Sequence, residues 1–380
     1  MSNSQQKNSR PISCPIFVFS HFGKKELDLN FLLERLNLYG KHYQARNQES
    51  LLVVLAGISI ADYNHLNHLT TTGLRIIRIS DPTKNALFFA IRSLRQIRDL
   101  KIRPSILIAG DIYFSAIACA LMGHLSSLKR VKTQISIHGF YFNIFKESNT
   151  VVSRIKAYHL KQLVRSVNSI RVVSKELKSD LVTNHKVDSR KVLVSPIPVS
   201  LDTNPVTNVR SVNVVFVGRL HSERGISRLQ EVIRHSLEGD PNVSFQIIGD
   251  GPLGNELQST FSPHSNQVEF KGHIPHTEII ESLRNSSILL STAQSEGFGL
   301  AIREALSAGC FVLAFSNPLT ESLQNSFPEQ VFTYKDIGDA ANQINSIKQR
   351  EINLHSVERF RQKQLSDNND SLNNLIQSWV

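Results

Sequence analysis

The chain has 380 residues, of which 41% are hydrophobic and 20% charged, a composition typical of a globular protein rather than a disordered one. Three cysteines are too few for a disulfide framework or a four-cysteine zinc site, so we expect a reducing, cytoplasmic compartment. No stretch approaches the roughly 18 apolar residues of a membrane-spanning helix. The polar first residues predict neither a signal peptide nor an anchor.

The formal net charge of +11 is unevenly distributed along the chain. Residues 1–200 contain 29 Lys+Arg and 12 Asp+Glu, whereas residues 201–380 contain 14 and 20. A basic first half, with Lys129, Arg130 and Lys132 in one short stretch, favours an anionic partner such as a membrane surface, a lipid phosphate or a nucleic acid. A basic surface that is merely solvated explains the same charge equally well.

Short β-branched runs alternate with helical patterns through the first half. Asp81 and Pro82 are typical of a helix start, and the pattern after them continues to residue 100, with Leu87 and Ile91 on one face together with Leu94. Such alternation predicts βαβ units and parallel sheets. The runs occupy residues 14–19, 51–57, 74–79, 105–110, 133–139 and 169–174.

The second half repeats the same rhythm. A segment with three prolines, residues 195–211, is typical of an interdomain linker, and the charge changes sign there. We predict one α/β domain over residues 1–205, a second over 206–345, and a helical segment, 346–380, that packs back across the junction. The strand-like runs occupy residues 212–218, 243–249, 267–270, 286–291, 310–315 and 330–334.

Two arginines follow the first strand of the second half. Arg219 and Arg224 lie at the predicted carboxyl edge of a parallel sheet, where ligands of open α/β sheets bind. A guanidinium group offers a fixed positive fork to phosphate oxygens, so the pair suits a diphosphate. Taken alone they are also explained as surface arginines. The next strand ends in a glycine turn at the same edge, where Gly249 and Gly251 would leave room for a ligand.

The stretch "STAQSEGFGLAIREALSAG", residues 291–309, predicts a loop followed by a helix that Gly309 ends. Free amides at the helix start, near Gly299 and Leu300, form an anion site. Glu304, in the second turn, is placed to accept hydrogen bonds from a ribose diol, and Glu296 lies where an attached sugar would lie. Singly, each glutamate is also explained as a solvated residue or a helix-dipole partner.

The second half closely resembles the donor-binding domain of the GT-B retaining glycosyltransferases of family 4, the glycosyltransferase group 1 proteins. The motifs are "FVGRLHSERG", "IIGDGPL" and "FKGHIPHTEIIESLRNSSILLSTAQSEGFGLAIREALSAGCFVLA", between Val212 and Phe315. The resemblance implies a GT-B fold, two Rossmann-like domains facing a central cleft. It also implies that Arg219 and Arg224 bind the donor diphosphate, with arginine at 224 replacing the usual lysine. The E-x7-E motif falls on Glu296, near the transferred sugar, and Glu304, on the ribose, and the backbone of Gly297, Phe298, Gly299 and Leu300 supports sugar and phosphate.

In the first half the resemblance covers less. "QISIHGF" is similar to the strand and histidine that face the donor sugar, which makes His138 the candidate contact; it is also explained as a buried or capping histidine. The glycine-rich loop after the first strand is reduced to Gly23, the only donor-binding candidate there.

The resemblance implies transfer of a sugar, with retention of configuration, from a UDP- or GDP-linked sugar to a saccharide or lipid-linked acceptor, in polysaccharide or glycolipid synthesis. No D-x-D-like carboxylate cluster is evident, so we expect no metal and no cofactor. An anionic membrane surface is a further expected partner, which places the enzyme at the cytoplasmic face of a membrane. Two alternatives stay open: a nucleotide-sugar epimerase of the same architecture, and a basic nucleic-acid-binding protein. The second lacks aromatic residues interleaved with the basic ones, and we expect no nucleic-acid partner.

Overall fold

The computed structural model describes residues 12–20, 26–47, 49–80, 85–125, 131–148, 150–206 and 210–379. The chain forms two compact units. The N-terminal unit contains the residues up to Pro196 and those from Asp370 onwards, and the C-terminal unit contains Ile197–Asn369. Each unit is built on one fully parallel sheet, so the predicted α/β class with two parallel-sheet domains is confirmed.

The N-terminal unit contains a seven-stranded sheet. Its central strands are buried on both sides, which explains their unbroken apolar runs, such as LLVVLA at Leu51–Ala56. The strands are β1 (Ile12–Ser20), β2 (Leu51–Ala56), β3 (Leu74–Ile79), β4 (Ile102–Ala109), β5 (Lys132–Ile137), β6 (Ser169–Val172) and β7 (Val192–Val194). Their order is β3-β2-β1-β4-β5-β6-β7.

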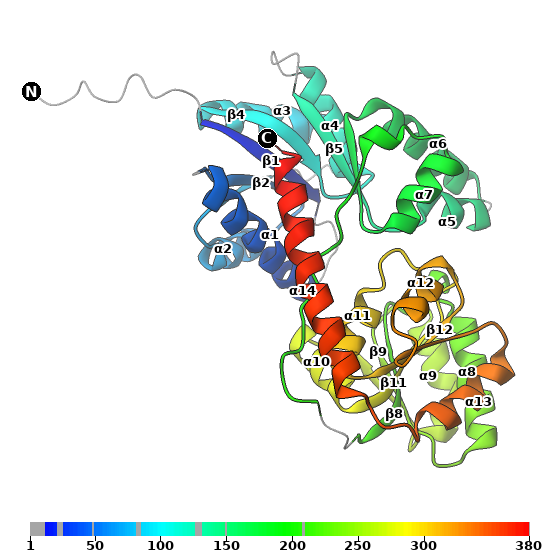
Figure 1. The fold of residues 1–380 in the computed structure, drawn as a ribbon. Coiled ribbons are helices and arrows are strands. Elements are labelled where there is room, and N and C mark those ends of the chain that lie inside the picture. Colours follow the sequence, from blue (N-terminus) through cyan, green and yellow to red (C-terminus); the bar gives the residue numbers. More distant parts are fainter. Residues whose placement is uncertain are drawn as a thin grey trace, which may run out of the picture. The chain divides into compact units, whose positions relative to one another are not determined.

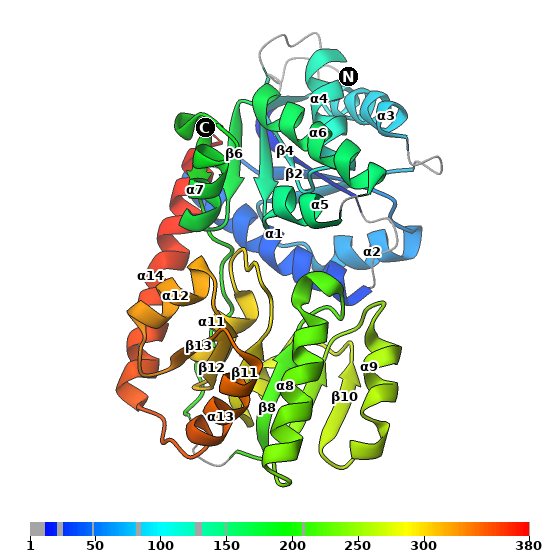
Figure 2. The ribbon, with the colours of Figure 1, turned by 90° about the vertical axis from the view of Figure 1, so that its right-hand side faces the viewer.

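Helices cover both faces of this sheet. Helices α1 (Glu26–Asn47) and α2 (Ile60–Leu69) share one core cluster with the sheet, whereas α3 (Ala86–Asp99) and α4 (Phe114–Leu125) lie on its opposite side (Figure 1). The connections that follow β5 and β6 carry α5 (Tyr141–Ser148), α6 (Val151–Ser166) and α7 (Lys175–Thr183) (Figure 2).

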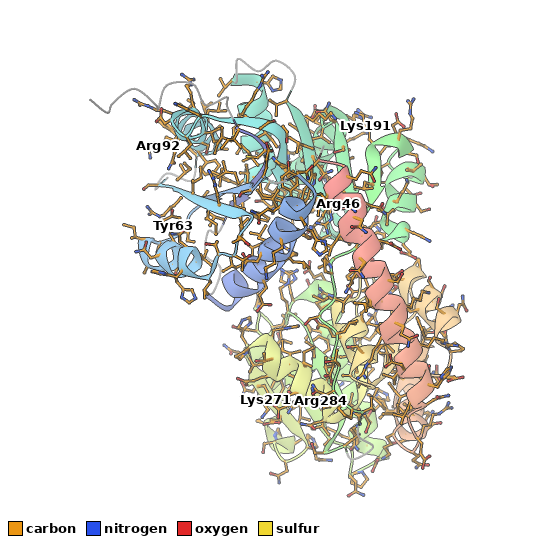
Figure 3. The ribbon with its side chains drawn as sticks, turned by 60° about the vertical axis from the view of Figure 1, so that its left-hand side comes forward. Arg46, Tyr63, Arg92, Lys191, Lys271 and Arg284 are labelled. Carbon is orange, nitrogen blue, oxygen red and sulfur yellow. The ribbon has the colours of Figure 1, made fainter. Side chains whose placement is uncertain are left out.

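The end of the chain completes the α1 side of the N-terminal unit. Helix α14 (Leu354–Gln377) begins in the C-terminal unit, and its last turns belong to the N-terminal unit. Arg46 of α1 donates a hydrogen bond to Asn373 Oδ1 at 2.8 Å (Figure 3). Just beyond the helix, the Trp379 ring meets Phe17 edge-on at 5.1 Å between centroids, and its Nε1 donates to Gln134 Oε1 at 3.1 Å. The polar terminal segment therefore buries its apolar end in this core.

The C-terminal unit contains a six-stranded sheet. Its first strand lies in the centre, and the chain winds first to one side of it and then to the other. The strands are β8 (Val212–Val217), β9 (Phe245–Ile248), β10 (Val268–Gly272), β11 (Ser286–Ser291), β12 (Phe311–Phe315) and β13 (Val331–Tyr334), in the order β10-β9-β8-β11-β12-β13. The winding direction reverses between β8 and β11, the kind of point where α/β sheets bind ligands.

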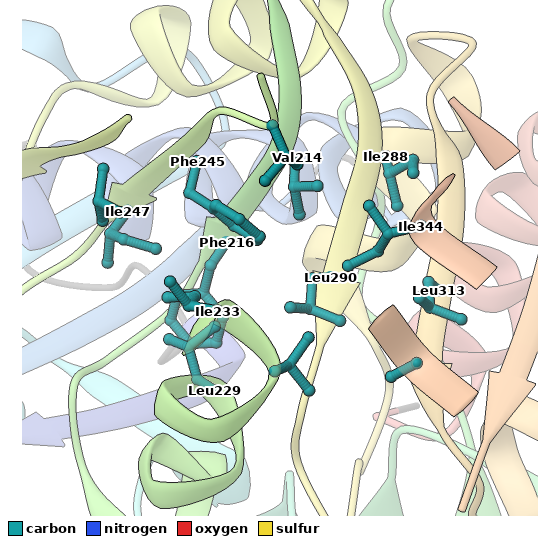
Figure 4. Packing of buried hydrophobic residues seen from close by; sticks show 14 of the residues in the cluster. Val214, Phe216, Leu229, Ile233, Phe245, Ile247, Ile288, Leu290, Leu313 and Ile344 are labelled. Carbon is teal, nitrogen blue, oxygen red and sulfur yellow. The ribbon is translucent and has the colours of Figure 1, made fainter. Parts of the chain in front are cut away.

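Two helical layers enclose the second sheet. One core cluster joins it to α8 (Ile226–Gly239), α9 (Gly254–Thr260) and α13 (Ile337–Ile347) (Figure 4). A second cluster, on the other face, joins it to α10 (His276–Arg284), α11 (Leu300–Ser307), α12 (Pro318–Ser326) and the first half of α14. None of the described helices of either unit is long and apolar enough to cross a membrane.

Helix α3 differs from its sequence pattern in the direction that it faces. Asn85 caps it, accepting hydrogen bonds from the amides of Leu87 and Phe88, whereas Asp81 and Pro82 lie outside the described residues. Leu87 and Ile91, which the pattern placed together, are exposed. The helix buries another stripe instead: Phe89, Ala90, Ser93 and Ile97.

The anchoring of the chain end gives a test of the N-terminal core. We expect Trp379→Ala to lower the free energy of unfolding of this unit by about 3–5 kcal/mol, because the indole is 2% exposed and its removal leaves a cavity. Trp379→Phe is the matched control, since it keeps one aromatic ring in the core; it loses the bond to Gln134, about 1 kcal/mol, and part of the indole volume, and should cost less than Trp379→Ala. Urea unfolding followed by circular dichroism measures both; equal losses for the two variants would contradict the packing role.

Candidate functional site

The carboxyl ends of β8, β9 and β11 meet at one edge of the C-terminal sheet. The loop after β8 contains Arg219 and the short 3₁₀ turn Ser222–Arg224, and α8 follows directly. The loop after β11 leads through Glu296 to α11. The reversal of winding between β8 and β11 brings these two loops together.

The two predicted phosphate-binding arginines have carboxylate partners. Arg219 forms an ion pair with Glu223, and its side chain is 70% exposed. Arg224 Nη1 lies 2.8 Å from Glu296 Oε2, and this pair is more buried. Arg224, predicted to bind the diphosphate, and Glu296, predicted to bind the sugar, are therefore in direct contact. Because a guanidinium has five donors, Arg224 can hold Glu296 and still bind an anion.

The loops after β8 and β11 are joined by hydrogen bonds from side chains to backbone carbonyls. Thr292 Oγ1 donates to the carbonyl of Arg224 at 2.7 Å, and Arg228 donates to the carbonyl of Thr292. Gly225 lies between them at φ 68°, and a Cβ there would overlap the Thr292 oxygen. Glycine at 225 is thus required twice, for its backbone angle and for the close approach. This contact fixes where Arg224 stands.

Gly249 and Gly251 are required by neighbouring backbone. Gly249 has φ 137°, and a Cβ there would overlap the carbonyl oxygen of Gly218; a Cβ on Gly251 would overlap that of Leu220. The Leu220 amide in turn donates to the carbonyl of Asp250 at 2.9 Å. The absent side chains let the loops after β8 and β9 pack together, and ligand contact at these glycines stays a prediction.

The start of α11 forms the other wall of the site. Gly299 caps the helix at φ 70°, and its amide donates to Glu296 Oε1 at 3.3 Å. The next amides of the first turn, beginning at Leu300, have no partner within the helix. Phe298, after the buried Gly297, packs its ring under the Arg303 guanidinium at 4.5 Å from the ring centroid, while Arg303 Nε donates to the Phe298 carbonyl at 3.1 Å. Arg303 therefore holds the loop that carries Glu296.

Glu304 is buried, at 3% exposure, which excludes a solvated helix residue. His276, the first residue of α10, places Nε2 2.8 Å from Glu304 Oε1. Since a carboxylate accepts only, the imidazole donates this bond. The pair holds the carboxylate in one orientation at the edge where the strands end.

His138 belongs to the N-terminal unit, directly after β5. Burial holds the pKa of His138 well below its ordinary value, and the positive charges of Arg171 and Arg35 lower it further. The side chain is therefore a neutral imidazole at pH 7, able to accept and donate one hydrogen bond each. Its approach to a donor sugar stays a prediction.

Three residues that the sequence analysis named, Gly23, Lys129 and Arg130, are outside the described residues. A cavity of about 450 Å³ in the N-terminal unit lies between α4, β5 and the end of α6, and none of the predicted site residues lines it.

Sequence reasoning missed four side chains that shape the site. Thr292 and Arg228 join the two loops, Arg303 supports the Glu296 loop, and His276 holds Glu304. Thr292 and Arg303 lie inside the quoted 291–309 stretch, but only the folded loop reveals their hydrogen bonds. His276 is 28 residues from Glu304, and no local pattern joins them.

Comparison with known proteins identifies the C-terminal unit. Residues 205–364 match the family Glycosyl transferases group 1, so this segment carries a group 1 glycosyltransferase domain. The chain is 27% identical over 221 residues to one component of the phosphatidylinositol N-acetylglucosaminyltransferase of Arabidopsis thaliana, covering 54% of this chain and 46% of that protein. The corresponding Homo sapiens protein is 27% identical over 258 residues, with coverage of 64% and 51%. The chain thus spans about half the length of these relatives.

Solved structures extend the likeness to the whole chain. The Anabaena protein Alr3699/HepE, solved in complex with UDP and glucose, has a TM-score of 0.70 at 16% identity, covering 96% of this chain and 99% of that one. A glycosyltransferase from Rickettsia africae has a TM-score of 0.68 at 16% identity, with 98% of each chain covered. At these identities the likeness shows the fold, and the predicted GT-B fold is confirmed.

The lowered pKa of His138 gives a pH-dependent prediction. An unfolded histidine has a pKa of about 6.5 and the folded one lies lower, so the unfolded chain binds more protons below that pH. This contribution to stability is complete above about pH 6.5 and is lost as the pH falls. We expect the free energy of unfolding of the native chain to fall by about 1 kcal/mol more than that of His138→Gln between pH 6.5 and 5.5. Urea titrations at both pH values measure it, and parallel losses would contradict it.

Proposed function

We propose that this chain, whose residues 205–364 carry a group 1 glycosyltransferase domain, moves a sugar from a nucleotide-diphosphate sugar to a hydroxyl of a saccharide or lipid-linked saccharide. The transfer would retain the anomeric configuration, require no metal and serve the synthesis of a cell-surface polysaccharide or glycolipid. The observation that carries the proposal is the meeting of Arg224, Glu296, the start of α11 and Glu304 at one sheet edge, inside the matched segment.

The diphosphate is assigned to the two arginines and the start of α11. Arg219 is exposed and forms an ion pair with Glu223. An ion pair in contact with water contributes at most about 1 kcal/mol to stability, so a diphosphate could replace the Glu223 carboxylate as the partner of Arg219 at little cost. Arg224 reaches a diphosphate with the donors that Glu296 leaves unused. The amides and partial positive charge of the first turn of α11 add a third contact of the same sign.

The ribose is assigned to Glu304. Its carboxylate can accept bonds from both hydroxyls of a vicinal diol, and His276 orients it from the opposite side. Glu296, fixed between Arg224 and the Gly299 amide, is then available to the hydroxyls of the transferred sugar.

In the reaction, the acceptor hydroxyl forms a bond to C1 of the sugar while the bond from C1 to the diphosphate breaks, and the hydroxyl proton passes to the leaving diphosphate. Negative charge collects on the leaving diphosphate, which Arg219, Arg224 and the α11 amides would surround. These groups are positioned before the reaction by the contacts at Thr292 and Gly225, so little reorganisation is needed as the charge develops. His138, neutral at pH 7, is proposed to contact the sugar.

The relatives support one class of acceptor. Several are components of phosphatidylinositol N-acetylglucosaminyltransferases, enzymes named for a lipid acceptor, and this supports a lipid-linked acceptor for the present chain. The Alr3699/HepE complex contains UDP, which supports a uridine donor ahead of a guanosine one. An acceptor in a bilayer would bring the enzyme to the cytoplasmic face of a membrane.

Substitution of the residues assigned to the diphosphate and to the ribose tests the donor site. We expect Arg219→Ala and Glu304→Ala each to weaken binding of UDP or GDP by about tenfold or more, because each removes a charge-assisted hydrogen bond. Arg234→Ala and Glu231→Ala, which break the exposed pair on α8, are the matched controls and should leave binding unchanged. Isothermal titration calorimetry measures all four; undiminished affinity in the site variants would refute the assignment.

The His276 contact predicts a division between binding and turnover. We expect His276→Ala to raise the KM for the donor about tenfold with little change in kcat. The reason is that His276 orients Glu304, the proposed ribose contact, and does not touch the reacting atoms. His276→Gln retains a donor and should recover most of the loss. A fall in kcat at unchanged KM would place His276 in the chemical step instead.

The epimerase alternative has a direct test. An epimerase converts the donor sugar without an acceptor, whereas the proposed transferase forms product only when an acceptor is present. Incubation with UDP- or GDP-sugar alone, followed by analysis for an epimer, separates the two activities.

A further inference from the structure

Exposed apolar side chains are concentrated on one layer of the N-terminal unit. Ten of the fifteen exposed large hydrophobic residues of the described chain lie between Leu87 and Tyr158, and the C-terminal unit has two, Leu354 and Leu365. The ten occur on or beside α3, α4 and α6, the helices of the connections on the side of the sheet away from α1. We call the outer side of these three helices the α3–α4–α6 face.

Helix α6 presents the clearest stripe on this face. Val151, Val152, Ile155 and Tyr158 are 60–72% exposed and follow the i, i+1, i+4, i+7 spacing of one helix side. The helix buries its other side, through Ser153, Leu160, Leu163 and Val164. The apolar stripe is therefore additional to the one that holds the helix to the sheet.

The same pattern occurs on α3. Leu87, Phe88 and Ile91 are 45–56% exposed, while the helix is held by a separate buried stripe. Arg92, beside them, lies on the outside of the unit (Figure 3). Two helices of one layer thus each carry an apolar stripe that their own fold does not use.

The charges on these helices are nearly all of one sign. Helices α3, α4 and α6 together contain seven lysines and arginines and a single acidic residue, Asp99. All seven basic residues are exposed: Arg92, Arg95, Arg98, Arg154, Lys156, Lys161 and Arg165. Apolar side chains interleaved with cations, with almost no acids, complement a surface that is anionic outside and apolar just beneath.

We propose that the α3–α4–α6 face docks on an anionic lipid bilayer, with the stripes of α6 and α3 entering the headgroup region and the seven cations among the lipid phosphates. Tyr158 suits this depth, since its ring is apolar and its hydroxyl polar. This inference rests on the proposed function in one respect: the docking would bring the enzyme to a lipid-linked acceptor. Neither the donor residues nor transfer is needed for the docking itself.

Vesicle sedimentation with the full chain tests the docking. We expect binding to phosphatidylcholine vesicles with about 30% phosphatidylserine, loss of most binding to pure phosphatidylcholine, and weakening from about 0.1 to 0.5 M salt. The triple variant Val152→Ser, Ile155→Ser and Tyr158→Ser should bind at least about tenfold less, because the stripe no longer enters the bilayer. Lys156→Gln and Lys161→Gln together should lower binding by about fivefold per lysine.

The matched control removes apolar side chains elsewhere. Leu354→Ser with Leu365→Ser on α14 alters two residues of similar exposure and should bind vesicles as the native chain does. Circular dichroism checks that each variant is folded, which the exposure of the substituted positions favours. UDP and GDP affinities, measured without vesicles, report separately on the proposed function.

Three results would overturn the docking proposal. They are equal binding to neutral and anionic vesicles, equal binding by the native chain and the α6 variant, and light scattering that shows a native dimer which the α6 substitutions dissociate. The last would assign the face to a second copy of the chain.

Discussion

The site depends on the contact between the loops that follow β8 and β11. Thr292 binds the Arg224 carbonyl, Arg228 binds the Thr292 carbonyl, and Gly225 leaves space for both. Arg224 and Glu296 are on separate loops, and without this contact the two loops would be less firmly joined. With it, a cation and a carboxylate are held 2.8 Å apart at the end of two adjacent strands. A parallel sheet whose winding reverses at that point supplies the two loops, and the glycine and threonine join them.

Much of this could be predicted from the sequence, because parallel strands buried on both faces leave a continuous run of apolar residues. All six runs of the second half are strands, and Gly309 has the positive φ expected of a glycine that ends a helix. In the first half the three-residue strand β7 was missed, since VLV is too short to stand out. The E-x7-E spacing also located two carboxylates at one sheet edge, because both lie on a loop and helix with fixed geometry.

Side-chain partners could not be predicted in the same way. The sequence predicted that Glu304 contacts a ribose and Glu296 a transferred sugar, but it did not show that Glu296 is paired with Arg224 and Glu304 with His276 of a different helix. Each pairing depends on which elements become neighbours in space. The paired residues are 72 and 28 positions apart in the sequence, and no local pattern links residues at such distances. The surroundings of Gly249 and Gly251 could not be predicted either, since backbone from the end of another strand fills the space beside them.

Helix α3 shows why an apolar stripe in a sequence does not say what it faces. Its sequence contains two, and the regular spacing of Leu87 and Ile91 is as good as that of Phe89, Ala90, Ser93 and Ile97. Only one can lie on the sheet, and the fold buries the stripe that contains Phe89, whose ring meets Phe114 of α4 edge-on at 5.3 Å between centroids. The stripe left outside is bordered by arginines rather than acids. In water this exposed stripe adds nothing to the packing of α3, whereas the proposed docking on anionic lipid would use both its apolar and its basic residues.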